Sequence, residues 1–228
     1  MQINENLNTK KDRKRKNYNQ YFTPENVVYE VLTLLPEMYF RSVIDPAVGE
    51  GVFVETAFNK WKQSKFFGID LDKKMVSKLK KKDIPNSFFL LGDSLSANTW
   101  NNPGIKKIVS EGGFELVLGN PPFSSWFHRI KQQEILVNYK LAYKNGRLLK
   151  SQAIEILFLE LFIKLAKAGC YIVIVLPDGI LSNLKHKYVR EFILKETKVK
   201  QIINFYRSVF QDTSSLTKFT FISLLVKK

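Results

Sequence analysis

The chain has 228 residues, enough for one α/β domain with a full hydrophobic core or for two small domains. Lys and Arg outnumber Asp and Glu by 36 to 21, and the net charge of +15 favours a polyanionic partner, although a lysine-rich proteome gives the same excess. The single cysteine, Cys170, excludes an intrachain disulfide and a cysteine-rich metal site, and the two histidines lack metal-ligand spacing, so we expect no bound metal.

The chain begins with a polar, basic arm at residues 1–17. Such arms are usually disordered and solvated, although they can also lie along a phosphate backbone. No apolar leader and no apolar run of membrane-spanning length is present, so we expect a soluble, cytoplasmic protein with no membrane partner. Residues 18–228 contain no internal repeat and are predicted to form one domain.

A first helix is predicted to begin at Thr23-Pro24, where a capping hydroxyl precedes a proline, and to end near Leu35. Strand-like apolar runs then alternate with amphipathic stretches, which is typical of a parallel sheet with helices on both faces. The strands are expected at 42–45, 66–70, 88–91, 115–119, 171–176, 201–205 and 219–226, and the further helices at 52–62, 73–82, 152–167 and 185–195. The last two strands should form an antiparallel hairpin at the edge of this seven-stranded α/β sheet.

A glycine-containing loop follows the first predicted strand, with the sequence Asp45-Pro46-Ala47-Val48-Gly49-Glu50-Gly51. Glycines at positions 49 and 51 allow a tight turn and a close approach of the backbone to a ligand. The third glycine of the dinucleotide fingerprint and the Gly-Lys-Ser/Thr of a P-loop are both missing. Taken alone, this stretch also fits a plain strand-to-helix turn.

Acidic residues at the ends of the next two strands favour a ligand. Asp70, followed by Leu71, ends the second strand at a position suited to accept hydrogen bonds from both hydroxyls of a ribose. Asp93 and Ser94 follow the third strand and offer an acceptor to the exocyclic amine of an adenine ring. Because the carboxyl ends of parallel strands meet along one rim, we expect a nucleoside-containing ligand there.

The fourth strand ends in Gly119-Asn120-Pro121-Pro122-Phe123. The two prolines fix the backbone and remove donors, so carbonyl oxygens remain as acceptors. Asn120 adds an amide oxygen and Phe123 an aromatic face. This combination suits a planar substrate with an NH2 group, and the alternative is a rigid turn at the exit of the strand.

In this order, the motifs resemble the N6-adenine DNA methyltransferases of restriction–modification systems whose cofactor motifs precede the catalytic motif. The resemblance extends from about residue 18 to the C-terminus. It implies a Rossmann-like methyltransferase fold, S-adenosylmethionine as cofactor and DNA as partner. It also implies methyl transfer to the N6 amino group of an adenine flipped out of the duplex.

The resemblance also implies individual roles. The leading motif Gln20–Pro24, which includes Tyr21, Phe22 and Thr23, is similar to the family's contact with the methionine end of the cofactor. The residues that resemble the other cofactor contacts are Asp45, Pro46, Gly49 and Gly51 of the glycine loop, Asp70 and Leu71 at the ribose, Asp93 and Ser94 at the adenine ring, and Asn120.

The segment Asn120–Phe123 is similar to the family's catalytic tetrapeptide. In the implied reaction, Asn120 and the carbonyl of Pro121 accept the two N6 hydrogens, Pro122 stiffens the loop, and Phe123 stacks on the flipped base. Ser208-Val209-Phe210 and the following strand resemble the final hairpin, whose Phe210 packs on the same base. Neither a metal nor a covalent intermediate is implied.

Three alternatives stay open. The tetrapeptide also occurs in methyltransferases that act on RNA or on protein glutamine, and Phe22-Thr23-Pro24 is what favours DNA adenine. No target-recognition domain is evident, so we expect a separate specificity subunit or domain, and a non-catalytic cofactor- or DNA-binding subunit is the third alternative.

The basic stretch Ser124–Lys150 is expected to be a helical connection rather than a segment that closes over the base.

Overall fold

A seven-stranded sheet runs through the structure, a computed structural model that describes residues 23–124, 129–205 and 219–227. The strand order is β3-β2-β1-β4-β7-β9-β8, and β9 is antiparallel to both of its neighbours while the other pairs are parallel. The strands are β1 (Ser42–Asp45), β2 (Lys65–Asp70), β3 (Ser87–Leu91), β4 (Phe114–Gly119), β7 (Ala166–Pro177), β8 (Thr197–Phe205) and β9 (Phe219–Val226). The predicted mostly parallel sheet with a C-terminal antiparallel hairpin at its edge is therefore confirmed.

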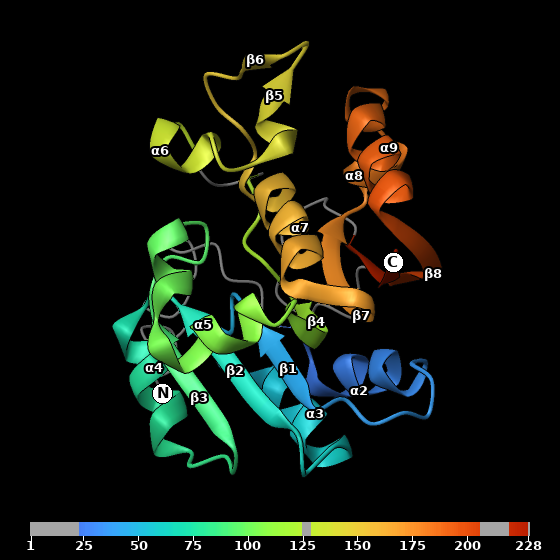
Figure 1. Cartoon of the computed structure of the whole chain (residues 1–228). Coiled ribbons are helices and arrows are strands. Elements are labelled where there is room, and N and C mark those ends of the chain that lie inside the picture. The colour runs from blue at the N-terminus through green and yellow to red at the C-terminus, as the bar shows by residue number, and fades with distance from the viewer. Residues whose placement is uncertain (1–22, 125–128, 206–218, 228) are drawn as a thin grey trace, which may run out of the picture.

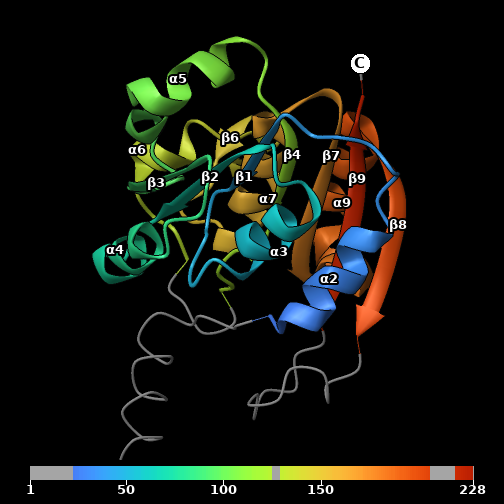
Figure 2. The same ribbon diagram turned by 90° about the horizontal axis from the view of Figure 1, so that it is seen from below.

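Helices cover both faces of this sheet (Figures 1 and 2). On one face lie α2 (Glu25–Thr33), α3 (Val52–Lys60) and α4 (Lys73–Lys81). On the other lie α5 (Pro103–Ser110), α6 (Gln133–Leu136), α7 (Ile154–Leu165) and α9 (Lys187–Glu196). Short elements complete the described chain: η1 (Ala97–Asn101), η2 (Lys140–Ala142), β5 (Tyr143–Lys144), β6 (Arg147–Leu148), α8 (Gly179–Ser182) and η3 (Leu184–His186).

The side chains of the strands alternate between two hydrophobic cores. In β1, Val43 packs toward α2 and α3, whereas Ile44 packs toward α7. In β2, Phe66 belongs to the same core as Val43, and Phe67 belongs to the same core as Ile44. Successive side chains of a strand point to opposite faces, so strands buried on both sides read as continuous apolar runs.

Helix α7 is buried all round rather than along one stripe. Ile156, Leu159 and Phe162 lie along one side of the helix, but Leu157 and Leu161 on the opposite side are buried as well, and so are Glu155 and Glu160. The helix is central because it lies between the sheet and the segment 129–150 (Figure 1). Two buried carboxylates on one helix require nearby hydrogen-bond donors.

Three features of the predicted organisation need correction. Helix α5 was not expected, although Asn102 caps it by accepting from the N–H of Gly104 at 3.0 Å and Pro103 begins it. The stretch after the tetrapeptide is not only a helical connection, because its described part also contains the β5–β6 hairpin. Thr23 does not cap α2: Pro24 is the N-cap residue, and its carbonyl accepts from Val27 and Val28.

Several predictions concern residues outside the described ones: the basic arm at 1–17, Tyr21, Phe22 and Phe210. Among the helices that the structure does describe, none is both long and apolar enough to span a membrane.

Candidate active site

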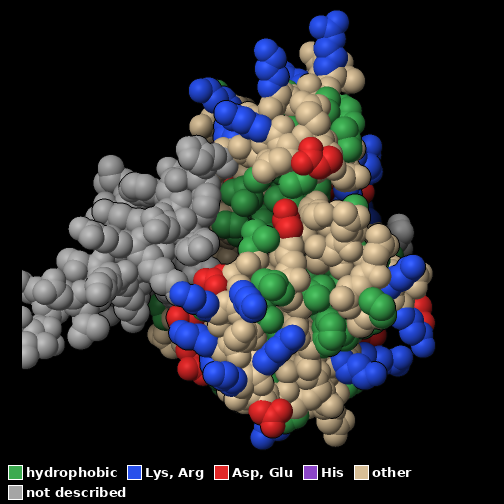
Figure 3. All heavy atoms as spheres, turned by 90° about the vertical axis from the view of Figure 1, so that its left-hand side faces the viewer, with side chains coloured by type: hydrophobic (Ala, Val, Ile, Leu, Met, Phe, Trp, Pro, Cys, Tyr) green, Lys and Arg blue, Asp and Glu red, His purple; other side chains and the backbone are tan. Residues whose placement is uncertain are grey.

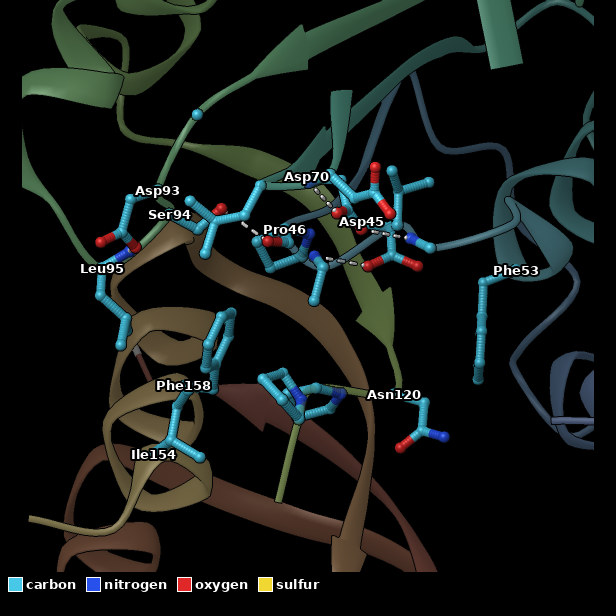
Figure 4. Close-up of a pocket in the computed structure, with 18 of the residues that line it drawn as sticks. Asp45, Pro46, Phe53, Asp70, Asp93, Ser94, Leu95, Asn120, Ile154 and Phe158 are labelled. Atoms are coloured by element: carbon cyan, nitrogen blue, oxygen red, sulfur yellow. Dashed lines mark hydrogen bonds between the residues drawn. The ribbon is translucent and has the colours of Figure 1, made fainter. Parts of the chain in front are cut away.

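A cavity of about 340 Å³ lies at the carboxyl ends of β1, β2, β3 and β4. In Figure 4, Asp93, Ser94 and Leu95 lie on one side of it and Asn120 on the other, with Asp45, Pro46 and Asp70 between them. Thr23 and the tetrapeptide residues Pro121 and Pro122 also line it. Residues from five separate parts of the sequence thus meet at the rim predicted for a ligand.

The glycine loop is left-handed at both predicted positions. Gly49 has φ +53° and Gly51 has φ +92°, which favour glycine because a side chain is strained there. Space beside Gly49 is open, since an added Cβ would meet only the carbonyl oxygen of Ala47 at 3.9 Å. Gly51 does not line the cavity; it is the N-cap residue of α3, and an added Cβ would lie 2.3 Å from a side-chain carbon of Leu79.

Asp70 connects the second strand to this loop. One carboxylate oxygen accepts the N–H of Gly49 at 2.9 Å and the other accepts the N–H of Asp72 at 2.7 Å. Burial raises the pKa of Asp70, although these N–H groups oppose the rise. Each oxygen can accept a further hydrogen bond, so the carboxylate shapes the loop and still faces the cavity.

The end of the third strand is tied to the same loop. The hydroxyl of Ser94 donates to the carbonyl of Pro46 at 2.6 Å, and Ser94 is buried. Asp93 accepts the N–H of Leu95 through one carboxylate oxygen at 2.9 Å. The hydroxyl of Ser94 is therefore engaged in a hydrogen bond that holds the loop, whereas the half-buried side chain of Asp93 lines the cavity.

Asp45 is the most deeply buried acid of the site, at 1% exposure. Its Oδ1 accepts the N–H of Ala47 at 2.9 Å, whereas its Oδ2 has no hydrogen-bond partner among the described residues. Burial raises its pKa from 3.8 to about 8, and the nearby charge of Asp70 adds to the rise. A buried acceptor with spare capacity at the wall of a cavity suits a cationic ligand group.

This raised pKa predicts a pH-dependent stability difference for Asp45→Asn. Because the folded-state pKa of about 8 exceeds the ordinary 3.8, the contribution of Asp45 is fully present below 3.8 and is lost as the pH rises through 8. The loss has a limiting slope of about 1.4 kcal/mol per pH unit. Asp45→Asn should therefore gain stability relative to the wild type between pH 5 and pH 8, measured by urea unfolding. An equal difference at both pH values would contradict the assignment.

The tetrapeptide Asn120–Phe123 is held at its first residue. The side-chain amide of Asn120 donates from Nδ2 to Oγ1 of Thr23 at 3.1 Å, and Thr23 is 4% exposed. This bond links the leading motif to the tetrapeptide and fixes which end of the amide turns toward Thr23. The resemblance implied a cofactor contact for Thr23, and the proline after it predicted a helix cap, but no local pattern indicated the hydrogen bond with Asn120.

We expect Thr23→Val to lower the rate of the methyl transfer that the resemblance implies by roughly fivefold, since one hydrogen bond is worth about 1 kcal/mol and the amide of Asn120 loses its restraint. Single-turnover kinetics with saturating cofactor measure this rate. The matched control is Thr56→Val, because Thr56 is equally buried and its hydroxyl bonds only to the carbonyl of Val52 within α3. Equal rates for the two variants would show that the bond to Asn120 is unimportant.

Phe123 is placed differently from the other tetrapeptide residues. Its ring is 1% exposed and belongs to the hydrophobic core on the side of α2 and α3, and it does not line the cavity. The ring contributes to that core in this structure. Stacking of a base on Phe123 or Phe210 stays a prediction.

An apolar wall of the cavity was missed in the sequence. It is formed by two stretches that follow the tetrapeptide. Its apolar members are Ile130, Ile135, Ile154 and Phe158, and the polar Gln132 lies beside them. The two stretches are joined by an antiparallel bridge between Ile130 and Gln152. No local pattern distinguishes these residues from ordinary core residues, because their place at the cavity depends on how the chain returns to it.

The fold defines the class of protein. It is similar to a protein described as a class I S-adenosylmethionine-dependent methyltransferase from Listeria monocytogenes, with a TM-score of 0.72 at 19% identity, covering 91% of this chain and 61% of that one. It is also similar to a modification subunit of a type I restriction enzyme from Vibrio vulnificus, with a TM-score of 0.70 at 18% identity, covering 96% and 48%. The chain therefore has the Rossmann-like class I methyltransferase fold that the sequence predicted.

Residues 5–224 match the family model N-6 DNA Methylase, and the chain belongs to that family. The type II methyltransferase M.AccI of Acinetobacter calcoaceticus is 25% identical over 207 residues, which are 87% of this chain. M.HincII of Haemophilus influenzae is 22% identical over 197 residues, or 86% of this chain. The chain spans about a third (35%) of the length of each of these curated relatives.

Proposed function

We propose that this chain transfers the methyl group of S-adenosylmethionine to the N6 amino group of an adenine flipped out of DNA, as part of a restriction–modification system. In this proposal, residues 18–228 are the catalytic domain. The observation that carries it is the position of Asn120, held by Thr23 at the rim of a cavity whose wall carries Asp45, Asp70 and Asp93. Membership of the N-6 DNA Methylase family supports the same reaction.

The residues of the cavity fit the cofactor. Asp70 and Asp93 offer carboxylate oxygens for ribose hydroxyls and an adenine amine, and the open space beside Gly49 admits close approach of a ligand. Leu71, which is 70% exposed beside Asp70, and Phe158 offer apolar contact for a ring. The buried Oδ2 of Asp45 is an acceptor for the ammonium group at the methionine end.

The bound cofactor supplies an electrophilic methyl group on a positively charged sulfur. The N6 nitrogen of adenine would accept this methyl group, the electron pair of the C–S bond would remain on sulfur, and the proton lost from N6 would be released to water. Asn120 Oδ1 and the Pro121 carbonyl accept the N6 hydrogens, which directs the lone pair out of conjugation with the ring and toward the methyl carbon. Catalysis is then mainly positioning and electrostatic stabilisation.

The charge distribution supports a nucleic-acid substrate. In the described segment 129–150 all six Lys and Arg side chains are exposed, with Glu134 as the single acidic residue. Figure 3 shows Lys and Arg side chains gathered at the upper end of the molecule, which α6 and the β5–β6 hairpin form in Figure 1. Lys and Arg provide the sequence-independent attraction to phosphates.

We also propose that a target-recognition domain or a separate specificity subunit works with this chain. Two facts support it: the chain corresponds to about a third (35%) of its curated relatives, and one of its structural neighbours is a modification subunit of a type I restriction enzyme. In this arrangement the partner chooses the DNA sequence and the chain described here supplies the chemistry.

The test of the proposed function asks which macromolecule accepts the methyl group. Calorimetry first measures binding of S-adenosylmethionine, and the protein is then incubated with tritiated cofactor and mixed-sequence duplex DNA, total RNA or a glutamine-containing peptide. We expect label in DNA alone. Label in RNA or peptide would favour the alternative methyl transfers, and bound cofactor with no transfer would favour a non-catalytic subunit.

A further inference from the structure

The catalytic tetrapeptide is held at its far end as well as at Asn120. Ser124 follows Phe123 directly, and both of its polar groups donate to one carboxylate. Its backbone N–H donates to Oε2 of Glu155 at 2.8 Å, and its hydroxyl donates to Oε1 at 2.7 Å. The two ends of the tetrapeptide are thus fixed by Thr23 and by Glu155.

Glu155 is a buried acidic residue without an ion-pair partner among the described residues, which is unusual for a glutamate. Its side chain is 7% exposed, and within the described part of the chain no Lys, Arg or His forms an ion pair with it. A buried carboxylate is unfavourable unless donors satisfy it, and here Ser124 supplies both of the hydrogen bonds. The first turn of α7 also favours a negative charge. The carboxylate is therefore directed at one residue of the catalytic loop.

The same turn of α7 forms part of the cavity wall. Ile154 and Phe158, which flank Glu155 on the helix, line the cavity (Figure 4). The helix that borders the cofactor cavity is therefore also the helix that holds the loop through Ser124. This arrangement sets the position of the tetrapeptide relative to the cavity.

We propose that Glu155 is a positioning residue for methyl transfer, acting through Ser124, and this inference rests on the proposed function. Glu155 fixes the exit of the loop and with it the carbonyl of Pro121 and the amide of Asn120. It lines neither the cavity nor the path of the methyl group, so its loss should lower kcat and leave KM for the cofactor unchanged.

The test compares Glu155→Gln with Glu160→Gln. Glu160 is the control because it lies on the same helix, is 0% exposed, and accepts two N–H groups, from Lys140 and Leu141, each at 2.7 Å; unlike Glu155, it also forms an ion pair, with Lys164 at 2.9 Å. We expect Glu155→Gln to lower kcat by about 10–100-fold, since small displacements of reacting groups have effects of this size. Glu160→Gln should lower thermal stability at least as much and leave kcat within about threefold, since its carboxylate does not touch the loop.

A double-mutant cycle tests the route through Ser124. If Glu155 acts on this residue, adding Ser124→Ala to Glu155→Gln should lower kcat no further than Glu155→Gln alone. If the two substitutions lower kcat additively, Glu155 does not act through Ser124. If Glu155→Gln has the same kcat as Glu160→Gln, Glu155 has no positioning role. Wild-type protein that transfers no methyl group to DNA would overturn the proposed function and this inference together, whereas full activity in Glu155→Gln would overturn the inference alone.

Discussion

Replacing Asn120 by alanine will lower methyl transfer to DNA by roughly 10²–10³-fold, the usual effect of losing one preorganised polar group at a reacting centre. The amide of Asn120 is held by Thr23 beside the cavity, so its oxygen has a fixed direction. Alanine removes the acceptor for an N6 hydrogen and leaves Asp45, Asp70 and Asp93 in place. Affinity for S-adenosylmethionine should therefore change much less than the transfer rate, and calorimetry with single-turnover kinetics measures both.

The control for this variant is Asn101→Ala, because Asn101 is an exposed residue of η1 and does not line the cavity. Its transfer rate should equal that of the wild type. If Asn120→Ala retains more than a tenth of the wild-type rate at saturating cofactor, then Asn120 does not have the assigned catalytic role.

Replacing Gly119 by alanine will lower the free energy of unfolding by about 2–4 kcal/mol, because overpacking and backbone strain each cost about 1–3 kcal/mol. Gly119 has φ +148°, and an added Cβ would lie 2.5 Å from Oδ1 of Asp45. Asp45 is buried and held by Ala47, so it has little room to move. The displaced loop should also lose methyl transfer. Urea unfolding measures the stability.

The variant Gly146→Ala measures the cost of backbone strain in the absence of a steric clash. Gly146 also has a left-handed φ of +74°, but an added Cβ there meets no atom within 4 Å. It should therefore destabilise the protein by strain alone. Asp45→Ala removes the clashing carboxylate, so Gly119→Ala should cost less in that background. A loss for Gly119→Ala no larger than for Gly146→Ala would contradict the close packing of Gly119 on Asp45.

The sequence predicted the sheet and the acidic rim well, because local patterns determine both. β1 and β9 have the predicted bounds, since strands buried on two faces are short apolar runs between polar turns. Asp45, Asp70 and Asp93 meet at one cavity because each lies at the carboxyl end of one of three neighbouring parallel strands.

Contacts between distant parts of the chain were not predictable in the same way. Thr23 looked like a helix cap by its local sequence, but its hydroxyl accepts from Asn120, which is 97 residues away. Phe158 carried no distinguishing signal, because cavity walls and cores use the same apolar side chains. Glu155 carried no local signal, since its partner Ser124 lies 31 residues earlier, in a stretch that was predicted only as a helical connection.

The central claim, that the methyl group goes to N6 of adenine in DNA, is tested most directly by identifying the methylated nucleoside. Duplex DNA treated with the wild-type protein and cofactor carrying a deuterated methyl group is digested to nucleosides and analysed by mass spectrometry. We predict the heavy methyl group in N6-methyldeoxyadenosine alone. Its appearance in a methylated cytosine, or its absence from DNA although the cofactor binds, would contradict the account.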